Sequence, residues 1–157
     1  DSSTSRGLGD VYKRQQEGET CMKFDTKIKI VLWEGLKPWQ ALNVTAFLMS
    51  GIAGTQEIIG KPYVDAEGHQ YLPMSQQPIM IHGASKEQLQ ELLQKGLFSE
   101  GLAVSIYTEE LFETFDDEAN RASVAGYQAQ ELNLVGIGLR GKKNKVDRLT
   151  KGLPLHE

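Results

Sequence analysis

The sequence predicts a single α/β domain in which a sheet with parallel strands carries helices on both faces. Apolar segments of strand length alternate with segments of helical period, which is typical of parallel strands joined by right-handed helical crossovers. Hydrophobic residues make up 39% and charged residues 24% of the 157 residues, close to the average of soluble globular domains. A chain of this length holds one core of ordinary size, so we expect one domain over residues 22–157.

The first half of the domain contains one strand, one long helix and a small hairpin. Residues 27–33 begin with polar and apolar side chains in alternation and become fully apolar, as expected of a strand that enters a covered sheet. Pro38 suits the first turn of a helix, and residues 39–53 carry apolar side chains on nearly every side, which predicts a largely buried helix. Residues 61–64 and 69–72 flank a turn and predict a hairpin.

The second half continues the alternation. Ser85 and Gln88 have the spacing of a capping box, which predicts the start of a helix whose leucines face the core. We therefore expect a sheet with at least two parallel crossovers, and helices on both of its faces. The remaining predicted elements are strands at residues 78–82, 102–107 and 134–139 and short helices at residues 118–125 and 144–151.

The first residues are not expected to belong to the domain. Asp10 to Gln15 resembles the translated end of a transposase adaptor used for sequencing libraries, and residues 1–15 show neither a helical nor a strand period. We expect residues 1–21 to be a non-native leader and Met22 to be the true start. A natural flexible tail is the alternative.

Composition argues against several classes of function. Cys21 is the only cysteine, so the predicted domain has no thiol for a disulfide or a thiolate metal site. His69, His82 and His156 are far apart, and we expect neither a metal nor a cofactor. The apolar segments are far shorter than the roughly 20 residues that cross a bilayer, and no secretory signal is recognisable. We therefore expect a cytoplasmic protein without membrane contact.

A glycine motif near the end of the chain invites a nucleotide-binding interpretation. Gly136, Gly138 and Gly141 match the G-x-G-x-x-G string of dinucleotide-binding proteins. The first two glycines fall inside a predicted strand, and only sixteen residues follow the motif, which leaves no room for the required crossover unit. We expect these glycines to serve close packing within the strand.

The strongest local charge follows the last predicted strand. Lys142, Lys143 and Lys145 would lie at the N-terminal turn of the last helix, where exposed N–H groups favour a phosphate. The stretch Arg140 to Lys151 is therefore a candidate contact for RNA, and a solvated helix face is the alternative. Its six basic residues, set against Asp147 alone, are Arg140, Lys142, Lys143, Lys145, Arg148 and Lys151.

An acidic segment, residues 109–118, carries six acids and no base. Asp116, Asp117 and Glu118 have the chemistry to bind a hard cation, but N-capping of the following helix is the simpler explanation. The hydrophobic members Leu111, Phe112 and Phe115 are expected to anchor this segment to the core.

Polar residues near the start of the long helix are candidates for a site. Asn43 and Thr45 interrupt its apolar sequence, and a buried amide there would need hydrogen-bond partners from a ligand or from a neighbouring strand. Trp39 and Gln40 follow the carboxyl end of the first strand, which is where open α/β sheets bind ligands.

Three stretches resemble a bacterial family, the domain-of-unknown-function family two thousand. They are PWQALNV at residues 38–44, YTEELF at residues 107–112 and LTKGL at residues 149–153. The C-terminal pattern, LVGIG followed by VDRLT and LPL, resembles the wider type II peptidyl-tRNA hydrolase superfamily. The likeness covers nearly all of residues 27–156. It implies a three-layer α/β/α sandwich around a mixed four-stranded sheet.

The chain departs from the enzymes of that superfamily at the positions that the resemblance implies for chemistry. Those enzymes carry several lysines at the start of the first helix, a glutamine and a histidine further along it, and an aspartate after the third strand. Here Pro38 follows Lys37, Phe47 and Ser50 lie near the polar helix positions, and Thr108-Glu109 follows the third strand.

Two hypotheses follow. The first is a domain that binds a small ligand or a protein partner near Trp39, Gln40, Asn43 and Thr108, with Lys142, Lys145 and Lys151 as further ligand contacts. The second is a hydrolase of an ester or amide, with Glu109 as the base for water, Asn43 on the scissile carbonyl, and Lys37 or Lys151 on the anion. A homodimer is compatible with either hypothesis.

Overall fold

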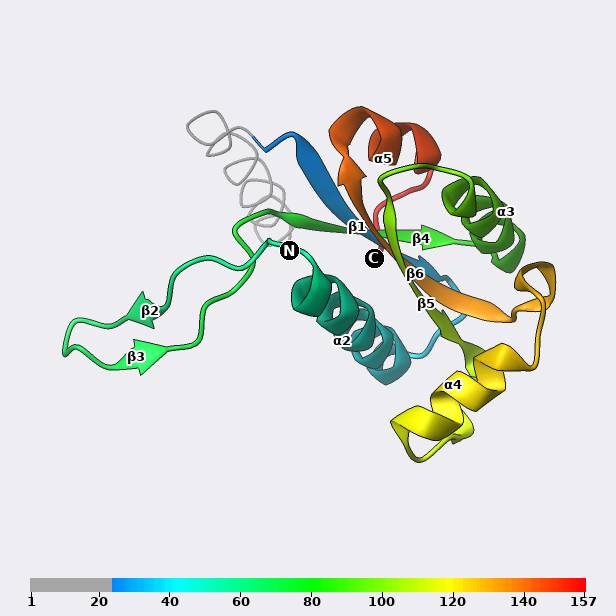
Figure 1. Cartoon of the computed structure of the whole chain (residues 1–157), viewed down its shortest axis with the longest axis horizontal. Coiled ribbons are helices and arrows are strands. Elements are labelled where there is room, and N and C mark those ends of the chain that lie inside the picture. The colour runs from blue at the N-terminus through cyan, green and yellow to red at the C-terminus, as the bar shows by residue number, and fades with distance from the viewer. Residues whose placement is uncertain (1–23) are drawn as a thin grey trace, which may run out of the picture.

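The computed structural model describes residues 24–157, and the predicted leader and start at Met22 lie outside the described residues. The main sheet has the strand order β4-β1-β6-β5 (Figure 1). Each strand lies within three residues of its predicted start and end. The strands are β1 (Thr26–Trp33), β4 (Ile79–Ala84), β5 (Ala103–Thr108) and β6 (Leu134–Lys142).

The sheet is mixed, as predicted. β1 pairs with β4 in parallel, and β6 lies antiparallel between β1 and β5. The three strands β1, β4 and β5 therefore run in one direction. Helix α2 (Pro38–Thr55) connects β1 to β4, and α3 (Lys86–Leu97) connects β4 to β5. Both predicted parallel crossovers are present. Within residues 24–157 the fold is α/β, with a four-stranded mixed sheet and four α-helices. The other two helices are α4 (Asp117–Ala125) and α5 (Lys143–Leu149).

Two hydrophobic clusters lie on opposite faces of the sheet because neighbouring side chains of a strand point to opposite sides. On one face, alternate residues of β1 pack against the buried stripe of α2. On the other face, Val31 and the β6 residues Ile137 and Leu139 pack against the leucines of α3, as the sequence predicted. The first cluster contains Ile28, Ile30, Leu32, Val44, Leu48 and Ile52, and the second contains Leu89, Leu92 and Leu93.

Helix α2 begins after Lys37, whose backbone N–H donates to Gln40 Oε1 at 2.9 Å. The prediction that this helix is largely buried was wrong. Only one stripe, Ala41, Val44, Leu48 and Ile52, is buried, and the opposite side faces solvent. Asn43 is exposed on that outer side, so it is not the buried amide that the sequence suggested. The half-buried Thr45 hydroxyl donates to the Ala41 carbonyl at 2.8 Å.

The glycines of β6 bring α2 close to the sheet. A Cβ added at Gly136 would lie 2.6 Å from Val44 Cγ1 and 3.0 Å from Leu48 Cδ1. At Gly138 it would lie 3.0 Å from Ile52 Cδ1. The G-x-G pair therefore packs a helix onto a strand, which agrees with the prediction of close packing.

The helix caps follow the predicted chemistry. Ser85 accepts from the Gln88 N–H while Gln88 accepts from the Ser85 N–H, and Asp116 accepts from the Ala119 N–H at the start of α4. The acidic segment forms a short 3-10 helix, η1 (Glu109–Glu113), and a second, η2 (Ala129–Glu131), precedes β6. The prediction that Phe115 packs on the core was wrong, because its side chain is exposed. Leu111 and Phe112 do pack there.

A hairpin arm projects from the body after α2 (Figure 1). Its strands are β2 (Tyr63–Val64) and β3 (Gln70–Tyr71), and Gly68 adopts a positive φ of 92° in the turn between them. The bridge between Ile59 and Ser75 marks its base.

The C-terminal residues pair with the free edge of β4. Gly83 N–H donates to the Pro154 carbonyl and His156 N–H donates to the Ile81 carbonyl, each at 2.9 Å. This contact covers backbone groups of an edge strand, which would otherwise be open to pairing with another chain. None of the helices within residues 24–157 is long and apolar enough to cross a membrane.

Candidate functional site

The carboxyl ends of β1, β4 and β5 meet at one edge of the sheet because the three strands are parallel. Open α/β sheets bind their ligands at this edge. Two features of the structure lie there. One is a cavity beside the start of α2, and the other is a polar cluster of residues at the ends of β1, β4 and β5 and at the start of β6.

The cavity has a volume of about 690 Å³, within the range of roughly 300 to 1,000 Å³ that is typical of small-ligand sites. The loop after β1, the first turns of α2, the end of β4 and the C-terminal segment surround it. Its lining residues are Glu34, Leu36, Pro38, Ala41, Leu42, Gly83 and residues 154–157.

The lining of the cavity is more apolar than polar, and its carboxylates outnumber its basic groups. Leu36, Ala41 and Leu42 supply aliphatic surface. Glu34 and Glu157 supply carboxylates and His156 supplies an imidazole, whereas no lysine or arginine is among the described residues that line the cavity. This combination favours a ligand with an apolar body and an ammonium or another hydrogen-bond donor.

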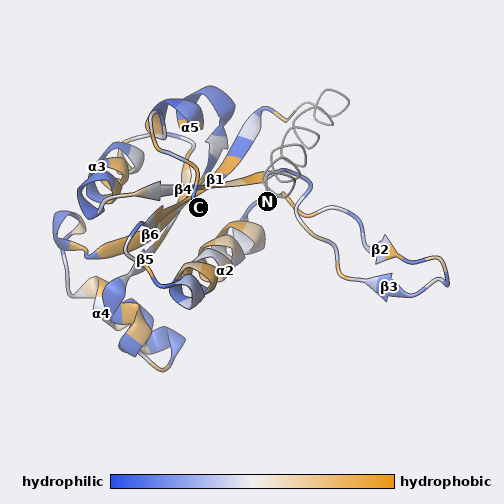
Figure 2. Ribbon diagram, turned by 180° about the vertical axis from the view of Figure 1, so that it is seen from behind, coloured by the Kyte–Doolittle hydropathy of each residue, from blue (hydrophilic) through white to orange (hydrophobic). Residues whose placement is uncertain are grey.

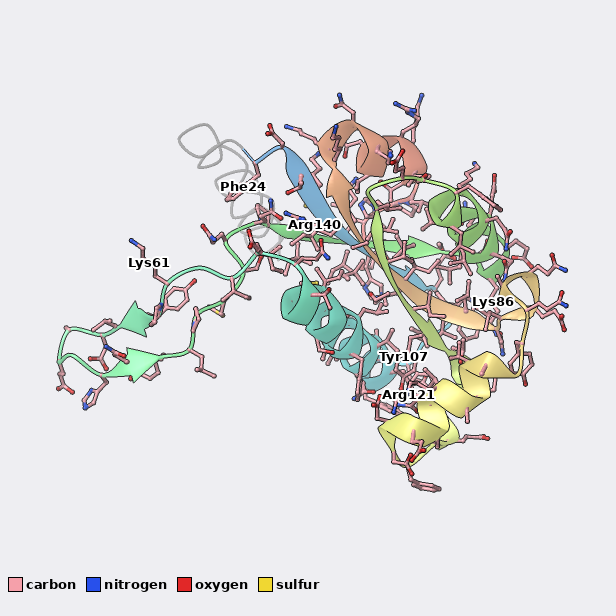
Figure 3. All side chains as sticks on the ribbon, viewed as in Figure 1. Phe24, Lys61, Lys86, Tyr107, Arg121 and Arg140 are labelled. Atoms are coloured by element: carbon pink, nitrogen blue, oxygen red, sulfur yellow. The ribbon has the colours of Figure 1, made fainter. Side chains whose placement is uncertain are left out.

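The polar cluster consists of Trp33, Lys86, Glu109 and Asn133. Lys86 Nζ donates to Glu109 Oε2 at 3.1 Å and to Asn133 Oδ1 at 3.0 Å, and Asn133 Nδ2 donates to the same Glu109 oxygen at 2.7 Å. Lys86 Nζ also lies 4.3 Å from the centroid of the Trp33 ring, which is a cation–π contact. Figure 3 labels Lys86 beside the start of β6.

These contacts determine the charge state of the Glu109 carboxyl. The hydrogen bond from Lys86, with a second from Asn133, lowers the pKa of the Glu109 carboxyl. Glu109 is therefore ionised at neutral pH, as a general base must be, but a lowered pKa also makes it a weaker base. The preceding residue, Thr108, is buried at the end of β5.

Aromatic side chains connect the start of α2 with the region after β5. Trp39 packs edge-on against Phe112 with ring centroids 5.7 Å apart, and Phe112 contacts Tyr107 at 5.1 Å. Phe47, further along α2, lies 5.9 Å from the same Tyr107 ring. Burial raises the pKa of the Tyr107 hydroxyl, so this group stays neutral.

The three residues predicted to act in hydrolysis do not form a connected group. Lys37 and Asn43 are exposed at the start and on the outer side of α2. No hydrogen bond or ion pair within residues 24–157 joins Lys37, Asn43 and Glu109. Gln40, predicted to bind a ligand, uses its side-chain oxygen to cap α2.

The residues of the predicted basic stretch make separate local contacts and do not act as one group. Arg140 Nη1 donates to Gln56 Oε1 at 3.1 Å, and Lys145 Nζ donates to the Glu100 carbonyl. Figure 3 shows Arg140 and Lys86 at opposite ends of the sheet. Lys142 and Lys151 are exposed.

Asp147, the one acid of that stretch, holds two lysines of β1. Lys27 Nζ lies 2.9 Å and Lys29 Nζ 3.3 Å from Asp147 Oδ1, and Lys29 also donates to Thr150 Oγ1 at 2.9 Å. Burial raises the pKa of the Asp147 carboxyl, but the hydrogen bonds from Lys27 and Lys29 outweigh this effect and lower it overall. A cavity of about 400 Å³, lined in part by Lys27, Lys29 and Lys143, lies beside this ion pair at the amino ends of β1 and β4.

The family of the chain follows from comparison with known proteins. Residues 26–157 match the model of the family described as "Protein of unknown function (DUF2000)". The chain belongs to this family. A solved structure of a protein of unknown function from Agrobacterium tumefaciens strain C58 is similar to it, with 44% sequence identity and a TM-score of 0.81. That match covers 85% of this chain and 99% of the other. No curated protein matches the chain.

The DUF2000 membership confirms the resemblance that the sequence motifs suggested, and the relation to peptidyl-tRNA hydrolases stays a prediction. Sequence reasoning missed Lys86, Trp33 and Asn133 in this DUF2000 chain. Each of them is a single polar or aromatic residue at the end of a predicted element, and no spacing rule marks such a residue.

One group of side chains has the composition of a metal site. Asp65, Glu67 and His69, in the turn of the arm, each offer a ligand atom within 4.8 Å of the others, and all three lie at the surface. The Asp65 carboxylate, however, already accepts from the Tyr71 hydroxyl at 2.9 Å and from two backbone N–H groups. These bonds, led by the one from Tyr71, lower the pKa of Asp65. The group therefore stabilises the turn of the hairpin.

Proposed function

We propose that this DUF2000 domain binds a small ligand in the cavity at the start of α2. The observation that carries the proposal is a cavity of about 690 Å³ at the carboxyl ends of β1 and β4. Its size, its mainly apolar lining and its place at this edge of the sheet are the properties that ligand sites of α/β proteins share.

The ligand that fits has an apolar body and an amine. Glu34 and Glu157 face a cavity without a compensating lysine or arginine among the described lining residues, so a ligand ammonium would supply the missing positive charge. Leu36 and Leu42 would contact the apolar part. A carboxylic acid of the same shape would meet like charges and bind more weakly.

The test compares amines with acids of matched shape on the isotope-labelled full chain. We expect 2-phenylethylamine to shift the amide resonances of Ala41, Gly83 and His156, and 3-phenylpropanoate to leave them unchanged. Glu34→Gln should weaken amine binding by about tenfold, the effect of about 1.4 kcal/mol. Glu87→Gln, an exposed carboxyl on α3, is the matched control and should bind normally. Equal binding of the acid, or no shift at these three residues, would contradict the proposal.

A second candidate is hydrolysis of an ester or amide on a peptidyl-tRNA hydrolase-like scaffold. It places the domain in that superfamily as a three-layer α/β/α sandwich. Helices on both faces of the sheet support this architecture, and the ionised Glu109 at the ligand-binding edge supports the chemistry. The test is turnover of peptidyl-tRNA by the purified chain, with Glu109→Gln and Asn43→Ala as variants. Turnover that both variants retain would exclude these two residues from the reaction.

A further inference from the structure

The outer side of α2 differs from that of an ordinary surface helix. A helix that covers one face of a sheet normally carries charged residues on its opposite side. The 18 residues of α2 include no aspartate, glutamate, lysine or arginine. Figure 2 shows the contrast, because much of α2 is pale to orange whereas α5 is mostly blue.

The exposed residues of α2 form one continuous stripe. This stripe lies opposite the buried one and consists of Trp39, Asn43, Ala46 and Ser50 at helical spacing. Leu42 and Phe47 lie to either side of it. Trp39, Leu42 and Phe47 are 57%, 74% and 54% exposed. Contiguous exposed apolar surface rimmed by polar residues is typical of interaction sites.

We propose that this outer face of α2 is the contact through which two copies of the chain form a symmetric dimer. This dimer does not require the ligand proposed above, although Leu42 belongs to both the cavity lining and the outer face of α2. The chain carries a formal net charge of −4, so most faces of two copies would repel each other. The α2 face is uncharged and can meet its own copy without that repulsion. A twofold contact requires such a self-complementary surface.

Small residues in the middle of the stripe suit a close helix pair. Ala46 and Ser50 leave room for the backbone of a second helix, and Leu42 and Phe47 would pack on both sides of it. We place the twofold axis at Ala46, near the middle of α2, and perpendicular to the helix, so that the two copies of α2 run antiparallel. The end of each α2 then lies beside the start of the other.

The hairpin arm supplies the area that the helix alone lacks. A stable interface buries about 800 Å² on each partner, whereas a helix of this length is roughly 27 Å long and 10 to 12 Å wide. The arm follows the end of α2 and projects away from the body (Figure 1). In an antiparallel pair it would therefore start beside the first turn of the partner's α2. Its large hydrophobic side chains, between 49% and 86% exposed, are Tyr63, Val64, Tyr71, Leu72 and Met74.

The first test is the mass of the full chain in solution by sedimentation equilibrium. We expect twice the chain mass of 17.5 kDa at micromolar concentrations. Ala46→Glu would bring two carboxylates together on the twofold axis and should raise the dimer Kd by about 100-fold or more. Ala122→Glu makes the same change at an exposed position of α4 and should leave the Kd unchanged. A monomer at all concentrations, or a dimer that tolerates Ala46→Glu, would overturn the proposal.

Cross-linking tests the geometry independently of affinity. In a background of Cys21→Ser, an Ala46→Cys chain should form a disulfide-linked dimer under mild oxidation because the two Cβ atoms face each other. Ala122→Cys should not.

The same mass measurement on a chain lacking residues 1–23 tests whether those residues, instead of a second copy, cover the outer face of α2. Dimerisation of the shortened chain only would show that these residues cover α2, and the proposal would be wrong for the full chain. Because Ala46 does not line the cavity, amine binding should survive Ala46→Glu.

Discussion

Lys29 shows what a single buried charge does in this fold. Its side chain is buried between the sheet and α5. Its ammonium forms an ion pair with Asp147 and donates a hydrogen bond to Thr150. A buried charge of this kind costs free energy unless its hydrogen bonds are complete. The side chain therefore fixes the position of α5 on β1.

Replacing Lys29 by Ala should destabilise the fold by about 1 to 3 kcal/mol, because it leaves Thr150 and part of Asp147 without a donor. Chemical denaturation measures this difference. Lys61→Ala, at an exposed position of the arm, should change the free energy of unfolding by less than about 0.5 kcal/mol. In an Asp147→Asn background the Lys29→Ala change should cost less, and strict additivity of the two changes would argue against the network.

His82 makes stability depend on pH. Its Nδ1 contacts the Leu153 carbonyl at 3.0 Å, while its Nε2 is buried without a hydrogen-bond partner among the described residues. Burial lowers the pKa of the His82 side chain, and the nearby Lys29 adds to this effect against the opposing Leu153 carbonyl. The folded chain therefore prefers neutral His82.

The consequence is a loss of stability in weak acid. The unfolded chain takes up a proton at His82 near pH 6.5, whereas the folded chain resists it, so the stabilisation is complete above that pH and is lost as the pH falls through the lower, folded pKa. Denaturation curves between pH 7.5 and 5 should show this loss. His82→Asn can still donate to Leu153 but does not titrate there, so its curve should be flatter. Identical slopes would exclude His82 as the cause. The carboxyls of Asp147 and Glu109, whose pKa values are lowered, affect the pH dependence of stability only near and below about pH 4.

Single residues were predictable where chemistry is local. The capping box of Ser85 and Gln88 and the cap at Asp116 depend on spacings of three residues, and the sequence contains these spacings. The contact of Lys86 with Trp33, Glu109 and Asn133 depends on four separate segments that meet only in the folded sheet. No local sequence pattern indicates a contact between such distant segments.

At the scale of elements, the pair of α2 and β6 depends on the absence of side chains at two positions. Gly136→Ala would place a Cβ 2.6 Å from Val44 Cγ1, which forces the helix away from the strand. We expect a loss of about 1 to 3 kcal/mol, the usual cost of overpacking a core. Thermal denaturation measures it.

A matched control is available within α2. Gly51→Ala adds the same methyl group where the nearest atom, Ser105 Cβ, is 3.9 Å away. Because alanine favours the helix over glycine, this variant should gain up to about 1 kcal/mol. A Gly136→Ala chain as stable as the original would show that β6 does not need its glycine.

The sequence predicted the bounds of α2 but not its exposure. Pro38 and the apolar run locate the helix, yet charged residues are what normally identify the outer side, and α2 has none. An apolar residue that faces solvent, such as Leu42, therefore looks the same in the sequence as a core residue. Phe115 was misassigned to the core for the same reason.

At the scale of the whole molecule, the distribution of charge bears on whether the protein binds nucleic acid. The net charge of −4 opposes binding over the general surface, and the stretch Arg140 to Lys151 is the strongest local exception. If that stretch binds RNA, the affinity should fall with salt concentration, and Lys142→Glu with Lys145→Glu should reduce both the affinity and the salt slope. Filter binding measures this. An affinity that the double change leaves intact would remove the stretch from consideration.

The overall architecture was the most predictable level. Alternation of strands and helices determined the sheet and both crossovers, because parallel strands leave few other ways to connect. The position of β6 between β1 and β5 was not predicted, since strand order depends on contacts between distant segments. The cavity was missed for a related reason. Its wall includes residues 154–157, which reach it only by pairing with β4.

The pairing of β1 with β6 also determines when this protein can fold during its synthesis. Thr26 pairs with Lys142, so the middle of the sheet is closed by the last of its four strands to be synthesised. At about 5 to 20 residues per second, β1 waits on the order of 10 s for that neighbour. Until β6 is made, the apolar side chains of β1 and α2 lack part of the sheet against which they pack. A chain that stops before β6 should therefore not yield a smaller stable domain, because β6 joins β1 to β5.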